Sequence, residues 1–169
     1  MGPVSVQLHM LGVRYTKSCF FIGHRDAPAR IKESLEKAVE ELICEHDVKE
    51  FIVGNHGNFD CIVQTVLSAA KKKKPEIRLL LLTAYHPAVR QVVLPEGFDC
   101  AYYPPGIEDA PLRFAIVRAN RTVVDTVDYL IAFVWHPGSA ARDLLEYAER
   151  RKLVKIHNIA NEFEVYRTK

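Results

Sequence analysis

The sequence predicts an α/β fold: a Rossmann-like three-layer α/β/α sandwich with a mostly parallel sheet. Short apolar runs recur along the chain, and stretches with helical spacing of apolar residues separate them. The apolar runs are continuous, which is typical of parallel strands that are covered on both faces. Because crossovers between parallel strands are right-handed, we expect the connecting helices on both faces of the sheet.

The expected strands are apolar runs rich in β-branched, aromatic and leucine residues, and the first two end at a glycine. The run at 77–82 (IRLLLL) is the most apolar in the chain, so we expect it at or near the centre of the sheet. The run at 98–101 is weaker, and a proline–glycine turn follows it. In chain order, the expected strands are 18–22, 51–53, 77–82, 98–101, 129–134 and 154–159.

The expected helices have an apolar face and a charged face. In 30–45, for example, Ile31, Leu35 and Leu42 share one face, and lysines and glutamates occupy the other. Pro75 ends the second helix, and the segment 83–97 is expected to be a longer polar connection. In chain order, the expected helices are 30–45, 60–74, 111–126 and 139–151.

The length of 169 residues, with 49% hydrophobic and 26% charged residues, indicates one globular domain. We assign this domain to residues 17–169. Residues 1–16 do not follow the strand–helix pattern, but Val4, Val6 and Leu8 alternate with other residues. The sequence leaves open whether 1–16 form an N-terminal arm or an edge strand.

The composition disfavours several classes of protein. Lys plus Arg number 23 and Asp plus Glu number 21, and the net charge of only +2 argues against a nucleic-acid partner. No apolar stretch is long enough to span a bilayer and no secretory signal is evident, so we expect no membrane association and a cytoplasmic location. The four cysteines are far apart without a C-x-x-C, which predicts buried thiols rather than disulfides.

Glycine, polar and basic residues collect where three of the expected strands end. Ligands of open parallel sheets bind beyond the carboxyl ends of the strands, where helix N-termini and backbone N–H groups converge. We therefore expect backbone amides from separate turns to face one shared hollow and to hold an anion. The expected ligand-binding residues are Gly23, His24, Arg25, Gly54, Asn55, Gly57, Asn58, Asp60, Arg121, Gly138 and Ser139.

The loop at 54–60 (GNHGNFD) is the most informative of these strand ends. Its G-x-x-G lets the backbone approach an anion, because glycine has no Cβ to block it. The loop lacks the G-x-G-x-x-G of dinucleotide sites and the G-K-[ST] of a Walker loop. Alone it fits a tight strand–helix turn equally well; together with Gly138 and Ser139 it favours a phosphate or nucleotide-like ligand.

His24, His56 and His136 each follow an expected strand. The close ligand spacing or carboxylate partner that is usual in zinc sites is not evident. We expect these histidines to hydrogen-bond a ligand or to cap loops, and we expect neither a metal nor a cofactor.

Four short motifs occur in the order found in a known family. Residues 21–25 (FIGHR) follow F-x-G-H-R, and 54–60 follow G-x-x-G-x-[FY]-D. Residues 120–132 (NRTVVDTVDYLIA) are similar to R-N-x-x-M-V-D followed by S-D-x-[LI]-I-A, and 137–139 (PGS) take the place of a glycine–glycine–threonine loop. Over about residues 18–160, the chain thus resembles the YpsA-like branch of the SLOG superfamily, named for the SMF/DprA and LOG proteins.

The resemblance implies a Rossmann-like sheet whose glycine loops hold a nucleotide or nucleotide-derived ligand. Among the relatives, LOG enzymes cleave the N-glycosidic bond of nucleoside 5′-monophosphates with an arginine and a glutamate. At those positions this chain has Ala119 and Arg142, and a carboxylate is needed to stabilise an oxocarbenium-like transition state or to move a proton. Asp60 and Asp143 are the remaining candidates for a catalytic carboxylate.

We therefore favour a SLOG-type domain that binds a nucleotide-like or other phosphorylated small molecule. The alternative is a LOG-like phosphoribohydrolase that uses Asp60 or Asp143, so the sequence leaves open whether the protein is an enzyme. A third possibility is a protein-interaction module whose crevice is vestigial. Relatives in the superfamily often dimerise through helices, so the resemblance also implies a possible homodimer.

Overall fold

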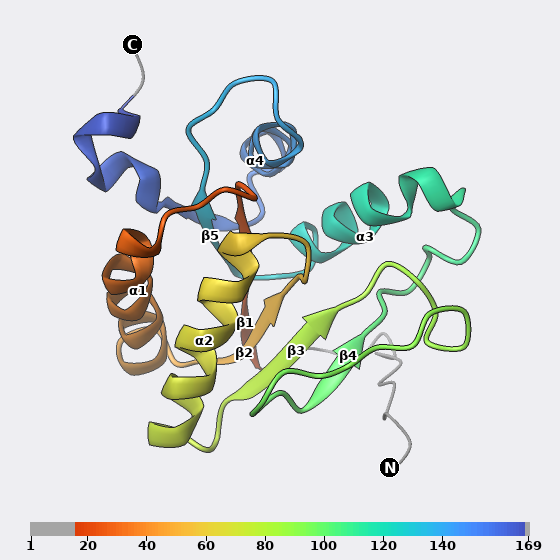
Figure 1. Cartoon of the computed structure of the whole chain (residues 1–169), viewed down its shortest axis with the longest axis horizontal. Helices are drawn as coiled ribbons and strands as arrows, with labels where there is room; N and C mark the ends of the chain where they lie inside the picture. The colour runs from red at the N-terminus through yellow and green to blue at the C-terminus, as the bar shows by residue number, and fades with distance from the viewer. Residues whose placement is uncertain (1–15, 168–169) are drawn as a thin grey trace.

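The computed structural model describes residues 16–167, and it contains one six-stranded sheet with the order β4-β3-β2-β1-β5-β6 (Figure 1). Every pair of neighbouring strands is parallel. The α/β/α fold predicted from the sequence is confirmed. The strands are β1 (Lys17–Gly23), β2 (Val48–Val53), β3 (Arg78–Leu82), β4 (Cys100–Tyr102), β5 (Tyr129–Phe133) and β6 (Lys155–Asn158).

The four α-helices of the described chain form the two outer layers, one on each face of the sheet (Figure 1). The helices are α1 (Lys32–Cys44), α2 (Asn58–Lys73), α3 (Ala115–Val124) and α4 (Ala140–Arg151). Alternate side chains of β1 point to opposite faces. Phe21 packs in the core beneath α1 and α2, whereas Phe20 packs in the core beneath α3 and α4. The continuous apolar pattern of the strands follows from this burial on both faces.

The strand ends differ from the sequence prediction chiefly in β2, which begins at Val48 rather than at residue 51. Its third residue, Glu50, is charged and yet only 4% exposed. Arg78 on the neighbouring β3 reaches the Glu50 carboxylate at 3.4 Å, which compensates for burying the charge. Among residues 16–167, β3 is the second strand from the edge of the sheet rather than a central one, because only β4 lies outside it.

The chain between β6 and residue 167 forms two short 3-10 helices, Ile159–Glu162 and Glu164–Tyr166, which the sequence pattern did not indicate. The expected strand at 154–159 ends early, at Asn158. There the Asn158 side chain accepts hydrogen bonds from the backbone N–H of Val134 and of Ala160, and it thereby turns the chain out of the sheet. The predicted arm or edge strand at 1–16 lies, except for Thr16, outside the described residues.

The cysteines agree only in part with the prediction of buried thiols. Cys19 and Cys100 are buried, but Cys44 and Cys61 are exposed on α1 and α2, and all four are free. Within 16–167, no helix has the length and apolar character needed to cross a membrane.

The direction of the crossovers reverses between β1 and β5. The chain moves from β1 through β2 and β3 to β4 on one side of β1, and then returns to place β5 on the other side. Gly23, at the end of β1, pairs with Phe133, at the end of β5, so the two strands end at the same level. In open α/β sheets such a switch point leaves a crevice beyond the carboxyl ends of the strands.

Candidate functional site

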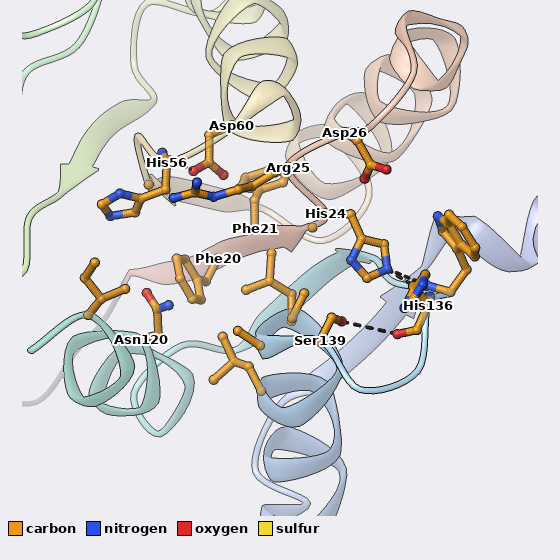
Figure 2. A pocket seen from close by; sticks show the side chains of 18 residues that line it. Phe20, Phe21, His24, Arg25, Asp26, His56, Asp60, Asn120, His136 and Ser139 are labelled. Carbon is orange, nitrogen blue, oxygen red and sulfur yellow. Dashed lines mark hydrogen bonds between the residues drawn. The ribbon is translucent and has the colours of Figure 1, made fainter. Parts of the chain in front are cut away.

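A cavity of about 470 Å³ lies at this switch point (Figure 2). Its walls come from the loops after β1, β2 and β5 and from the facing sides of α3 and α4. The lining residues are Phe20, Phe21, Ile22, Gly23, His24, Arg25, Asp26, Gly54, His56, Asp60, Ile116, Asn120, Trp135, His136, Ser139, Ala140, Ala141 and Leu144. We call this space the switch-point cavity. Six of the residues predicted to bind a ligand line it, namely Gly23, His24, Arg25, Gly54, Asp60 and Ser139.

The loop after β1 contributes the cationic group of the cavity. The guanidinium of Arg25 extends toward Asp60 and His56 in Figure 2. Arg25 is exposed to solvent and forms no ion pair with a carboxylate of residues 16–167. Its charge acts on the nearby Asp60, and its planar fork of N–H donors suits a phosphate.

The last residue of β1 must be glycine. A Cβ on Gly23 would lie 2.3 Å from Cγ of Phe59, the second residue of α2. The Phe59 ring is 1% exposed and stacks on Phe133 with 6.3 Å between the ring centroids. Gly23 thus allows α2 to begin directly against the end of β1, which brings the Asp60 side of α2 to the cavity.

His24 holds the loop after β5. Its Nε2 atom accepts hydrogen bonds from the backbone N–H groups of Trp135 and His136, both at 3.0 Å. An imidazole that accepts through Nε2 carries its proton on Nδ1 and is neutral. Burial lowers the pKa of His24, and the charges of His136 and Arg142 act in the same direction against that of Asp26. His24 is therefore a hydrogen-bond acceptor that fixes one wall of the cavity.

Asp60 lies in the first turn of α2 and closes the loop after β2. Its Oδ2 atom accepts a 2.8 Å hydrogen bond from the backbone N–H of His56, and a Cβ on Gly54 would lie only 2.9 Å from Oδ2. Burial raises the pKa of Asp60, whereas the hydrogen bond from His56 and the charges of His56 and Arg25 oppose the rise. A carboxyl group with a raised pKa beside a cavity is a candidate for a functional residue.

Ser139 begins α4 at the opposite wall. Its Oγ atom accepts a hydrogen bond from the backbone N–H of Arg142 at 3.1 Å and donates one to the carbonyl of His136 at 3.2 Å. This is an ordinary N-cap, so the Ser139 hydroxyl is already used by the fold. Gly138 adopts a φ of +68°, which favours glycine and turns the chain into the helix.

Six predicted site residues do not line the switch-point cavity, and two of them contact the loop after β1 instead. The side-chain amide of Asn58 donates to the carbonyl of Ala27, and a Cβ on Gly57 would meet the Cα of Arg25 at 2.8 Å. These residues join the loops after β1 and β2 instead of facing a ligand. The six are Asn55, Gly57, Asn58, Arg121, Gly138 and Asp143.

Arg121 illustrates how the helix phase decides which side chain reaches the cavity. Successive residues of a helix are about 100° apart around its axis. Asn120 lines the cavity, whereas the guanidinium of Arg121 lies over the ring of Tyr147 on α4, 5.0 Å from its centroid. Asp143 on α4 is exposed and also points elsewhere. Asn120 is therefore the polar residue that α3 contributes.

Some of the loop amides that were predicted to face a shared hollow are instead used within the fold. His24 accepts hydrogen bonds from the backbone N–H groups of Trp135 and His136, and Asp60 accepts one from the backbone N–H of His56. The amide of Asn58 donates to the carbonyl of Arg25. These four amides are consequently not free to bind a ligand.

Several lining residues were not among the predicted site residues. The helices contribute Ile116 and Asn120 from α3 and Leu144 from α4. In the sequence, the one signal for these residues is the pattern of apolar and polar side chains along each helix. His56 and His136 line the cavity but do not form a cluster of metal-ligating atoms. Among residues 16–167, the one such cluster is Glu41, Glu45 and His46 on the surface at the end of α1, away from this cavity.

The sheet order and the cavity place the chain among doubly wound α/β proteins with a site at the switch point. No model of a protein family and no curated protein sequence matches the chain. Among solved structures, the chain is similar to DNA processing protein A (DprA) from Streptococcus pneumoniae, with a TM-score of 0.59 and 17% identity. The match covers 83% of this chain and 50% of the DprA chain, and at this identity it shows a shared fold.

Proposed function

We propose that this chain is a SLOG-type domain that binds a nucleotide-like or other phosphorylated small molecule in the switch-point cavity. The observation that carries the proposal is the convergence of three strand ends on one open cavity, with an exposed arginine at its edge that forms no ion pair within residues 16–167. The fold shared with DprA supports the superfamily that the motifs of the sequence indicated. The YpsA-like branch remains part of this proposal and rests on the motifs alone.

The walls of the cavity suit the two ends of a nucleotide. Ile22, Ile116 and Leu144 supply apolar surface against which a base or ribose can pack. Asn120 on the same side offers both a donor and an acceptor for the edge of a base. Arg25 lies at the opposite side, beside the loop after β2, where it would bind a phosphate (Figure 2).

Isothermal titration with the four common nucleoside 5′-monophosphates and their diphosphates tests this proposal. We expect at least one to bind, and Arg25→Ala to weaken that binding about tenfold or more, the effect of losing a charge-assisted bond worth about 1.4 kcal/mol. Arg118→Ala is the matched control, because Arg118 is an exposed arginine of α3 that does not line the cavity. Folded protein that binds none of these compounds would overturn the proposal.

Asp60 favours one second function, a phosphoribohydrolase that cleaves the N-glycosidic bond. It is the candidate carboxylate that lines the cavity, whereas Asp143 lies outside it. Its raised pKa suits a group that protonates the leaving base. Arg142, at the position of the LOG glutamate, instead donates to the carbonyl of Trp135 at 3.4 Å.

Incubation with AMP and detection of free adenine separate the enzyme from the binding domain. An enzyme releases adenine, and Asp60→Asn abolishes the release while binding is kept. A protein that binds AMP for hours without releasing base is a binding domain.

A further inference from the structure

A second cavity, of about 270 Å³, lies at the same edge of the sheet, beyond the ends of β2 and β3. His56 lines both cavities, so they adjoin at the loop after β2. We call this space the β3 cavity. It is lined by Asn55, His56, Leu81, Leu82, Thr83, Ala84, Tyr85, Arg90, Gln91, Val92 and Val93. The proposed nucleotide site uses none of these residues except His56.

The place where the two cavities adjoin is polar. Arg25 reaches toward His56 from the switch-point side, and Asn55 belongs to the β3 cavity (Figure 2). Arg25 and His56 belong to different loops, so an anionic group between the cavities would have donors on two sides. This arrangement suits a bound phosphate or diphosphate that spans the junction between the two cavities.

The β3 cavity itself has the character of a site for a ring. Leu82 and Val92 supply apolar surface. Arg90 and Tyr85 both line it, and the guanidinium of Arg90 lies over the ring of Tyr85, 5.5 Å from its centroid. Arg90 forms no ion pair with a carboxylate in the described part of the chain, so its charge is not already neutralised there. Asn55 and Gln91 add hydrogen-bonding groups that a sugar or a base could use.

We propose that the ligand has two parts: a nucleoside in the switch-point cavity joined through a diphosphate to a second ring, a sugar or a base, in the β3 cavity. This inference rests on the proposed function and names the class of its ligand. The carrying observation is that two cavities of different lining share His56, with Arg25 beside it. A mononucleotide fills only the first cavity, so the second ring adds binding energy of its own.

The test compares matched ligand pairs by isothermal titration: AMP with ADP-ribose, UMP with UDP-glucose, and GMP with GDP-mannose. We expect the two-part member of the preferred pair to bind about tenfold or more tightly than its monophosphate. Val93→Trp blocks the β3 cavity at its rim, where Val93 is 82% exposed and tolerates a larger side chain. This variant, and Arg90→Ala, should weaken the two-part ligand about tenfold and leave the monophosphate within about twofold.

Val89→Trp is the matched control, because Val89 is 75% exposed on the same connection but does not line the β3 cavity. It should change neither affinity. If a monophosphate binds but its two-part partner binds no more tightly, or if Val93→Trp and Arg90→Ala leave the two-part ligand unaffected, this inference is overturned and the proposed function stands. If no ligand of either kind binds, the proposed function fails, and this inference fails with it.

Discussion

The carboxylate of Asp60 accepts a 2.8 Å hydrogen bond from the backbone N–H of His56 at the point where the loop after β2 becomes α2. The bond folds the loop back on the helix, and the missing Cβ of Gly54 leaves room for the carboxylate. Because Asp60 also lines the switch-point cavity, one side chain both closes the loop and faces the proposed ligand.

The raised pKa of Asp60 predicts how stability depends on pH. Burial is the main cause, so the folded state binds the carboxyl proton more tightly than the unfolded state. Stability contributed by Asp60 is therefore lost as pH rises from the ordinary value of 3.8 through the raised pKa. Urea unfolding of the wild type and Asp60→Asn, from about pH 3 to about pH 6, should show the wild type losing stability relative to the variant. A relative gain over this range would contradict the prediction.

His24 predicts the opposite dependence on pH. Burial lowers its pKa, so protonation favours the unfolded state, and stability is lost as pH falls below 6.5 toward the folded pKa. His24→Gln keeps an acceptor for the amides of Trp135 and His136 and should remove this loss. His24→Ala leaves both amides without a partner and should cost about 2 kcal/mol at pH 7. Chemical denaturation measures both effects; equal pH profiles for the wild type and His24→Gln would exclude His24 as the group responsible.

The sheet was predictable because its strands are apolar on both faces, but the beginning of β2 was not. Glu50 interrupts the apolar pattern, and its neighbour Arg78 on β3 compensates for the burial of its charge. That pairing joins residues 28 positions apart, so it depends on the sheet order. A local pattern carries no information about such a partner.

The position of the site was predictable from the order of strands and helices along the chain, whereas the roles of its residues were not. Strand ends meet at the switch point in any doubly wound sheet, which is why Arg25 and Asp60 were expected there. The choice between Asn120 and Arg121 depends on the rotation of α3, a difference of one residue. His24 accepts a hydrogen bond from the amide of Trp135, and these two residues are 111 positions apart in the chain. A local sequence pattern could not indicate this contact.

Replacement of Gly23 by alanine tests the close approach of α2 to β1. The added methyl group would stand 2.3 Å from the Phe59 ring, and the ring is buried against Phe133, so it has little room to move. We expect a loss of about 1–3 kcal/mol in the free energy of unfolding, the usual cost of overpacking a core. In a Phe59→Leu background the same replacement should cost less, because the ring that it meets is gone. Equal losses in both backgrounds would show that the strain lies elsewhere.

The C-terminal 3-10 segment packs on the cavity wall through a pair of aromatic rings. Tyr166 stacks on Trp135 with 4.9 Å between the ring centroids, and Nη2 of Arg30 donates to the Tyr166 hydroxyl at 2.8 Å. Trp135 is the single tryptophan of the chain, so its fluorescence reports this contact without interference. Tyr166→Ala uncovers one face of the indole and should shift the emission to longer wavelength, with a loss of roughly 1 kcal/mol of stability.

Tyr166→Phe separates the stacking from the hydrogen bond. It keeps the ring over Trp135 and loses only the bond from Arg30, which is exposed, so its emission should match the wild type. Because Trp135 also lines the switch-point cavity and lies edge-on to His24 at 5.6 Å, a bound nucleotide should alter the same emission. If Tyr166→Ala leaves the spectrum unchanged, the indole is not covered by Tyr166. A titration that changes the emission of Tyr166→Phe as it does that of the wild type places the ligand against Trp135 independently of the C-terminal contact.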